Sequence, residues 1–169
     1  MAFPTALTTR VLIAANGIEG PDYYQAGDSL LKPGMVCMED DADEVKVCIT
    51  TGIPLGIVGC DADHDLGTVY TVGERIPVWL LGTGVDIYIR SKDAGTQTIT
   101  KNSIMVTADD TTLKGHTMVK DAHIVMTTAN AQTAGTTRNL TTFFWLGRSL
   151  ETGSILTDTV MYVPVKLST

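Results

Sequence analysis

Glycine and proline interrupt short apolar runs throughout the stretch from Gly52 to Arg90, and this feature constrains the fold most strongly. The apolar residues recur with a period near two, which is typical of β-strands, and no part of the chain keeps an apolar helical period over the length of a helix. The loop Gly82-Thr83-Gly84 separates strand-like runs at 75–81 and 85–90, an arrangement that predicts a β-hairpin. Pro77 cannot donate a backbone hydrogen bond, so we expect its strand to lie at a sheet edge or to carry a bulge.

Short strand candidates continue along the rest of the chain, with turn residues about every 8–12 positions. Two of them flank the acidic loop 39–44 and suggest a hairpin there. This spacing is typical of a β-sandwich or barrel, so we expect an all-β fold of about ten short strands. The other candidates are 10–14, 35–38, 45–49, 55–60, 68–72, 103–107, 113–120, 123–127, the aromatic run 143–146 and 159–167.

The N-terminal part of the chain lacks a clean period after Ala15 and contains the turn signals Asn16-Gly17 and Gly20-Pro21. We therefore expect an extended N-terminal arm at 1–26, with one short strand, followed by a β-sandwich or barrel domain at 27–169. Two interpretations of the arm stay open. It is either a frayed terminus or a segment that becomes ordered on a partner.

Length and composition indicate a globular protein of about one domain, because 44% of its 169 residues are hydrophobic. The net charge of −7, from 12 basic and 19 acidic residues, disfavours direct binding to nucleic acid. No apolar run approaches the roughly 18 residues of a membrane span, and the N-terminal apolar piece is short for an export signal. Three cysteines do not form a disulfide framework, so a reducing cytosol and assembly inside a cell are expected.

The acidic turn Asp61-Ala62-Asp63-His64-Asp65 resembles the opening of a calcium-binding loop. An EF-hand loop has glycine at its sixth position and glutamate at its twelfth, where this chain has Leu66 and Val72. We favour a solvated acidic turn with an exposed His64. A cation site of another kind, using Asp61, Asp63 and Asp65, stays open.

The remaining candidates for chemistry are weaker. Cys37, Cys48 and Cys60 are spaced too widely for the paired ligands of a structural zinc site, so we expect buried free thiols. The segment 147–151 lacks the second glycine of a G-x-S-x-G nucleophile elbow. His116 and His123 have no spacing to a nucleophile that would mark them as bases. No phosphate-binding motif is present, and we expect neither enzymatic activity nor a cofactor.

Trp79 and Trp145 lie in apolar strand candidates of a chain in which aromatic residues make up only 6%. Packing in the core is the simpler interpretation of both side chains. An aromatic anchor at a subunit interface is the alternative.

Several motifs occur in an order that resembles the head decoration (cement) proteins of tailed phages and related viruses. The resemblance covers roughly 27–167 and consists of residues that mark turns and strands rather than a catalytic signature. Its motifs are the Pro-Gly turn within 31–36, the Gly-Ile-Pro-Leu-Gly-Ile-Val-Gly run at 52–59, the segments 70–78 and 84–88, and 146–151 with the closing strand.

This resemblance implies a β-rich, often trimeric protein on the outer surface of an expanded icosahedral capsid. Such a protein clamps neighbouring major capsid subunits at three-fold or quasi-three-fold positions. It occupies the host cytoplasm during assembly and contacts neither nucleic acid nor membrane. In several such proteins the N-terminal arm adds a strand to the capsid protein. The corresponding arm residues here are Thr5, Leu7, Arg10, Val11, Leu12 and Ile13.

Two other classes of function stay open. A host- or carbohydrate-binding β-module of a virion fibre or spike would show surface aromatics around Trp79, Tyr88 or 143–145. A small β-barrel enzyme would need a polar cleft in which histidine and carboxylates converge.

Overall fold

The protein is all-β, as the sequence predicts. The computed structural model describes residues 1–7, 10–16, 20–49, 52–92, 96–107, 117–120, 145–157 and 159–167. These residues form thirteen strands and no helix, whereas the sequence predicts about ten strands. The predicted strand at 123–127 lies outside the described residues, and the candidate at 68–72 is a loop. The strands are β1 (Leu12–Ala14), β2 (Asp22–Ala26), β3 (Val36–Asp41), β4 (Glu44–Val47), β5 (Pro54–Val58), β6 (Arg75–Leu80), β7 (Asp86–Ser91), β8 (Gln97–Ile99), β9 (Ile104–Thr107), β10 (Thr117–Lys120), β11 (Trp145–Ser149), β12 (Gly153–Ile155) and β13 (Met161–Leu167).

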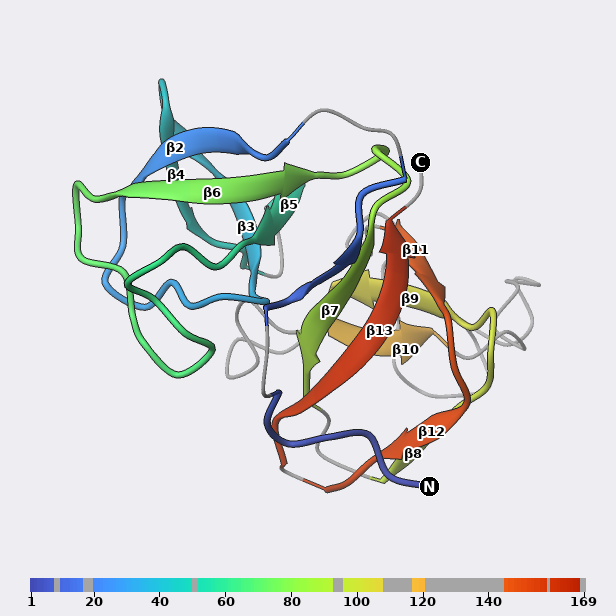
Figure 1. Ribbon diagram of the computed structural model, residues 1–169. Coiled ribbons are helices and arrows are strands. Elements are labelled where there is room, and N and C mark those ends of the chain that lie inside the picture. The colour runs from blue at the N-terminus through green and yellow to red at the C-terminus, as the bar shows by residue number, and fades with distance from the viewer. Residues whose placement is uncertain are drawn as a thin grey trace, which may run out of the picture.

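Strands β2 to β6 form a closed barrel, in the order β2-β4-β3-β5-β6 (Figure 1). The predicted hairpin is confirmed, because β3 and β4 pair antiparallel, but the predicted acidic loop 39–44 is shorter: residues 39–41 and 44 belong to the strands, and the turn lies at 42–43. Alternate residues of each strand face the barrel interior, as the period of two requires. The interior residues form one cluster: Ala26, Leu31, Met35, Cys37, Val45, Val47, Val58, Tyr70, Ile76 and Val78.

The remaining strands form a second lobe beside the barrel. Strand β13 pairs along one edge of β7, while β1 and β10 occupy different parts of the other edge. The pairings run from β7 through β13, β11, β9 and β10 back to β7. A separate two-stranded sheet of β8 and β12 lies at the end of this lobe where the chain begins (Figure 1).

The predicted hairpin across Gly82-Thr83-Gly84 is wrong. The strands on its two sides, β6 and β7, do not pair with each other. Strand β6 pairs with β5 and β2 in the barrel, and β7 pairs with β13 and β1 in the second lobe. The loop is therefore the connection between the two lobes. Pro77 likewise lies in a strand of the closed barrel rather than at a sheet edge.

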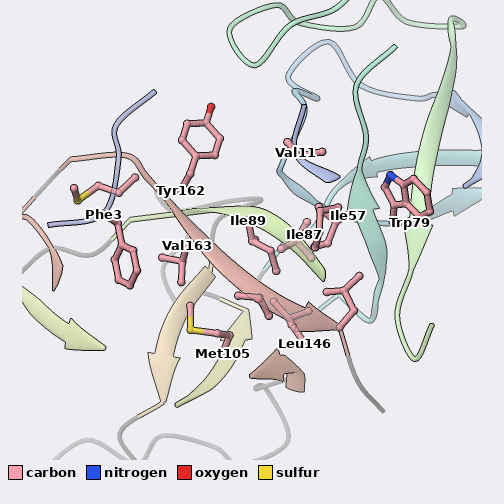
Figure 2. Packing of buried hydrophobic residues seen from close by; sticks show 14 of the residues in the cluster. Phe3, Val11, Ile57, Trp79, Ile87, Ile89, Met105, Leu146, Tyr162 and Val163 are labelled. Carbon is pink, nitrogen blue, oxygen red and sulfur yellow. The ribbon is translucent and has the colours of Figure 1, made fainter. Parts of the chain in front are cut away.

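A second hydrophobic cluster, which we call the shared core, lies between the two lobes. Val36, Ile57 and Trp79 come from barrel strands but face outward, because their neighbours Cys37, Val58 and Val78 fill the barrel. They pack in the same cluster as Val11, Ile87, Ile89, Met105, Leu146 and Val163 of the second lobe (Figure 2). Both faces of these barrel strands are consequently buried, as the near-continuous apolar runs at 55–58 and 76–81 suggest.

The predicted division into an arm at 1–26 and a domain at 27–169 does not match the strand pairing. Residues 22–26 form β2, which pairs with β6 on one side and with β4 on the other and so closes the barrel. Residues 12–14 form β1 and pair with β7. The predicted arm thus contributes strands to both lobes. The sequence of β2 did not indicate a strand, because most of its residues face solvent and only Ala26 is fully buried.

Candidate functional site

A hollow of about 800 Å³ is lined by residues of both lobes. Its walls come from residues 5–7 and Arg10, from the acidic turn at 60–68, and from Arg90 and Tyr162 of the second lobe. The lining therefore combines charges of both signs with aromatic and hydroxyl groups.

A hydrogen-bonded group forms the second-lobe side of this cleft. Arg90 Nη1 donates to the carbonyl oxygen of Leu66 at 3.2 Å and lies 3.0 Å from the hydroxyl of Tyr162. That hydroxyl also donates to the Leu66 carbonyl, at 3.2 Å. Burial raises the pKa of Tyr162, although the neighbouring Arg90 opposes this effect. Two strands of the second lobe thus hold the acidic turn of the barrel in place.

His64 is not exposed, contrary to the sequence-based expectation. Its side chain is only 10% exposed, and its ring stacks on Tyr70 with the centroids 4.2 Å apart. Nδ1 lies 2.9 Å from Asp61 Oδ1, and Nε2 lies 3.3 Å from Glu74 Oε1. Among the described residues, these three could hold a metal ion, since their ligand atoms lie within 4.8 Å of one another. Sequence spacing did not indicate Glu74, because the fold of the loop before β6 brings it there.

Two carboxylates of the predicted acidic turn, those of Asp61 and Asp65, accept hydrogen bonds from residues two or three positions further along the chain. Asp61 Oδ1 accepts hydrogen bonds from the backbone N–H groups of Asp63 and His64, at 2.9 and 2.8 Å. Asp65 Oδ1 accepts from the Gly67 N–H and the Thr68 hydroxyl. Partial burial acts to raise the pKa of Asp61, but the bonds from His64 and Asp63 outweigh it and the pKa is lowered. This use of the carboxylates differs from that in an EF-hand loop.

The cleft does bring a histidine and carboxylates together, as a small β-barrel enzyme would need, but it shows little of the arrangement that activates a nucleophile. Cys60 lines it, but burial raises the pKa of this thiol, which keeps it protonated and weakly nucleophilic near neutral pH. Both ring nitrogens of His64 already face carboxylates. Ser149 of the incomplete nucleophile elbow lies in β11, buried, and donates to the Thr100 carbonyl. His116 and His123 lie outside the described residues. The geometry around His64 favours a structural role in holding the loop 61–74.

The predicted arm residues divide into two groups, one packed with the core and one at the surface. Val11 is 1% exposed, and its carbonyl accepts a hydrogen bond from the Tyr88 N–H. Leu7 and Leu12 also pack against the core. Thr5, Arg10 and Ile13 face outward, and Ile13 lies in β1, the first strand of its sheet.

The two tryptophans have different environments. Trp79 is 8% exposed and belongs to the shared core, whereas Trp145 is 44% exposed at the start of β11. The Trp145 indole donates to the Gly147 carbonyl at 3.1 Å, and the guanidinium of Arg148 lies 5.1 Å from its ring. Arg148 in turn donates to the Asn102 carbonyl. Trp145 is therefore an exposed aromatic side chain with a fixed orientation, which sequence alone did not distinguish from Trp79.

The three cysteines are free, as expected, but only two of them are buried. Cys37 and Cys48 are buried, and Cys60 is half-buried. Burial raises the pKa of Cys37 to about 12 and that of Cys48 to about 11. Such thiols are unreactive in their protonated form.

Comparisons with known proteins identify no family. No family model and no curated protein matches the chain. The described residues contain no helix with the length and apolar character needed to cross a membrane.

Proposed function

We propose that this protein is a structural virion protein that binds the outer surface of an expanded icosahedral capsid. In this proposal it acts as a homotrimer and stabilises the shell by clamping neighbouring major capsid subunits. The observation that carries the proposal is where the motifs that resemble those of decoration proteins lie in the fold. They form the turn before β3, strand β5, the entry to β6, and strands β7, β11 and β13, which build both lobes and their junction.

Two glycines of these motifs are required by close contacts between strands. A Cβ atom on Gly56 would lie 2.4 Å from the carbonyl oxygen of Trp79. One on Gly147 would lie 2.0 Å from the carbonyl oxygen of Lys166. Gly56 and Gly147 are thus positions at which this framework accepts no side chain, so both motifs contribute to the packing of the strands.

The surface provides two features suited to docking on a protein lattice. Strand β1 has β7 as its strand partner among the described residues and carries the exposed Ile13, and in this proposal an extended capsid segment adds to its other edge by main-chain hydrogen bonds. Trp145, oriented by Arg148, is the type of residue that anchors interfaces. In the arm, Thr5, Arg10 and Ile13 are available for this contact, while Leu7, Val11 and Leu12 remain with the core.

Clamping follows from simple thermodynamics. A protein that binds only the expanded lattice stabilises that lattice by mass action. Three linked copies convert weak contacts into avidity. The net charge of −7 helps to keep the free protein soluble.

Co-sedimentation with empty expanded capsids of the virus that carries the protein tests the proposal. We expect saturable binding, a mass of three chains by light scattering, and a higher temperature of capsid disruption. An Ile13→Asp variant should weaken binding, and Asp43→Asn, on the exposed tip of the β3–β4 hairpin, is the control. Protein that stays in the supernatant at all concentrations would overturn the proposal.

A carbohydrate-binding module is the second candidate, because Trp145 offers an exposed aromatic ring. Arg148 already lies over this ring, which leaves less of it for a sugar. A glycan screen distinguishes the two functions. Binding that depends on Trp145 and occurs without capsids would favour the module.

A further inference from the structure

The first four residues occupy a socket on the second lobe. Phe3 is 5% exposed and enters one end of the shared core (Figure 2). Its N–H donates to the Ser154 carbonyl at 3.1 Å, and the Ser154 N–H donates to the Met1 carbonyl at 3.0 Å. The Pro4 carbonyl accepts a hydrogen bond from the Tyr162 N–H at 2.9 Å. The segment is therefore held by main-chain bonds and by one aromatic side chain.

Gly153 makes room for this aromatic ring. A Cβ atom there would lie 2.7 to 2.9 Å from three ring carbons of Phe3, and the three nearest atoms all belong to that ring. Gly153 is not among the residues with positive φ, so its backbone conformation suits other residues. A larger residue at this position would thus clash first with the Phe3 ring, and we expect it to displace the N-terminal segment.

The socket is also an acceptor for a strand. Strands β8 and β12 form a two-stranded sheet, and a sheet of this size is marginally stable alone. Ala2 adds to it through a parallel bridge to Ser154. When the N-terminal segment leaves, the sheet loses this neighbour and the Ser154 and Tyr162 N–H groups lose their acceptors.

We propose that this socket is a docking site for the N-terminal segment of a second copy of the chain, so that two copies can exchange residues 1–4. The segment seated in the socket identifies the occupant that fits it. The same contacts form whether the segment belongs to the same chain or to another, and exchange of an identical element is a low-cost route to association.

The concentration of the protein determines whether the segment occupies the socket of its own chain or that of another copy. A segment on the same chain competes with an effective concentration in the millimolar range, which in dilute solution favours the arrangement in which each segment occupies its own chain's socket. Exchange is favoured where copies are held close together, as they would be in the trimer of the proposed function. The socket itself does not depend on capsid binding, so it can be tested with purified protein alone.

Two full-length variants separate the socket from the segment. Gly153→Val closes the socket and frees an intact N-terminal segment, and Phe3→Ala leaves the socket open to a segment with Phe3. Light scattering should show a larger mass for their mixture than for either variant alone. The double variant Phe3→Ala/Gly153→Val should add nothing to either partner. An unchanged mass in the mixture of two folded variants would overturn the proposal.

A cysteine pair keeps the test valid if either variant fails to fold. Chains with Ala2→Cys and chains with Ser154→Cys are mixed at high concentration and oxidised, both with Cys60 replaced by serine. We expect a disulfide-linked heterodimer that exceeds the product of Ala2→Cys with Thr157→Cys chains, the matched control. Equal amounts in both mixtures would refute exchange. Because no capsid is present, this result is independent of the proposed function.

Discussion

The hydroxyl of Tyr70 donates to the carbonyl oxygen of Gly59 at 2.9 Å, in a position that a backbone N–H would otherwise fill. The antiparallel register of β5 and β6 places Gly59 opposite Pro77, and the Gly59 N–H donates to the Pro77 carbonyl at 2.8 Å. The return bond of such a pair would come from the N–H of residue 77, which proline lacks. Tyr70 supplies that bond from the loop before β6, and this is how the barrel accommodates proline in a strand that is not at an edge.

Removing this hydroxyl should destabilise the barrel. Tyr70→Phe keeps the ring and its stacking on His64 but leaves the buried Gly59 carbonyl without this donor, at a cost of about 1–3 kcal/mol. Urea unfolding measures this loss as a lower midpoint with an unchanged slope. Tyr23→Phe, at an exposed ring on β2, is the matched control and should change stability by less than about 0.5 kcal/mol. Equal midpoints for Tyr70→Phe and the parent protein would contradict the assignment.

Acid should weaken the loop that contains His64. The pKa of Asp61 is lowered from its usual 3.8, so its charged form stabilises the folded state. The contribution is present above the unfolded-state value and is lost as pH falls through the folded-state value. In Asp61→Asn the amide oxygen still accepts from the Asp63 and His64 N–H groups, but the charge is gone. The difference in melting temperature between parent and variant should therefore shrink as pH falls below 3.8. Asp63→Asn, on the same turn, is the control, and a constant difference would exclude this role of Asp61.

Thiol reactivity should follow burial. Because burial raises the pKa of Cys37 to about 12 and that of Cys48 to about 11, both remain protonated at pH values near 8 and should resist alkylation in the native state. The stabilisation from the neutral thiols is present below their usual value of 9 and is lost as pH rises toward 12. Burial also raises the pKa of Cys60, but this thiol is only half-buried and reagents can reach it. Mass spectrometry after brief labelling should therefore locate native modification at Cys60 and modification of all three in denaturant. Rapid native labelling of Cys37 would show that the barrel opens.

The fold class followed from the sequence because its signals are local. The Pro-Gly turn before β3 and the acidic loop between β3 and β4 both act within a few residues, and the hairpin they indicate is present. The connection at 82–84 also carries a strong local turn signal, but local residues do not determine which strands pair. Strand β7 pairs with β13 at the far end of the chain, in register from Asp86 to Ser91, and buries its apolar face there instead of beside β6.

The candidate sites were harder to predict, because they depend on contacts between distant segments. The sequence predicts an exposed His64 within an acidic turn, but in the fold its ring contacts Tyr70 and Glu74 and becomes largely buried. Phe3 had no recognisable role, since its socket is formed around Gly153. From the sequence, Trp79 and Trp145 have the same two interpretations, and the neighbouring strands determine which ring is covered.

Replacing each tryptophan with alanine should separate folding from docking. Trp79→Ala removes a core side chain that joins the barrel to the second lobe, and we expect a loss of about 3–5 kcal/mol in the free energy of unfolding. Trp145→Ala removes an exposed ring and should cost less than about 1 kcal/mol. If Trp145 anchors the capsid interface, the folded variant should sediment with expanded capsids at least about tenfold less tightly than the parent. Lys101→Ala, at an exposed turn of the same lobe, is the control for changes in surface charge and shape. Unchanged capsid affinity in a folded Trp145→Ala protein would remove this residue from the interface, and β1 would then be the surface to test.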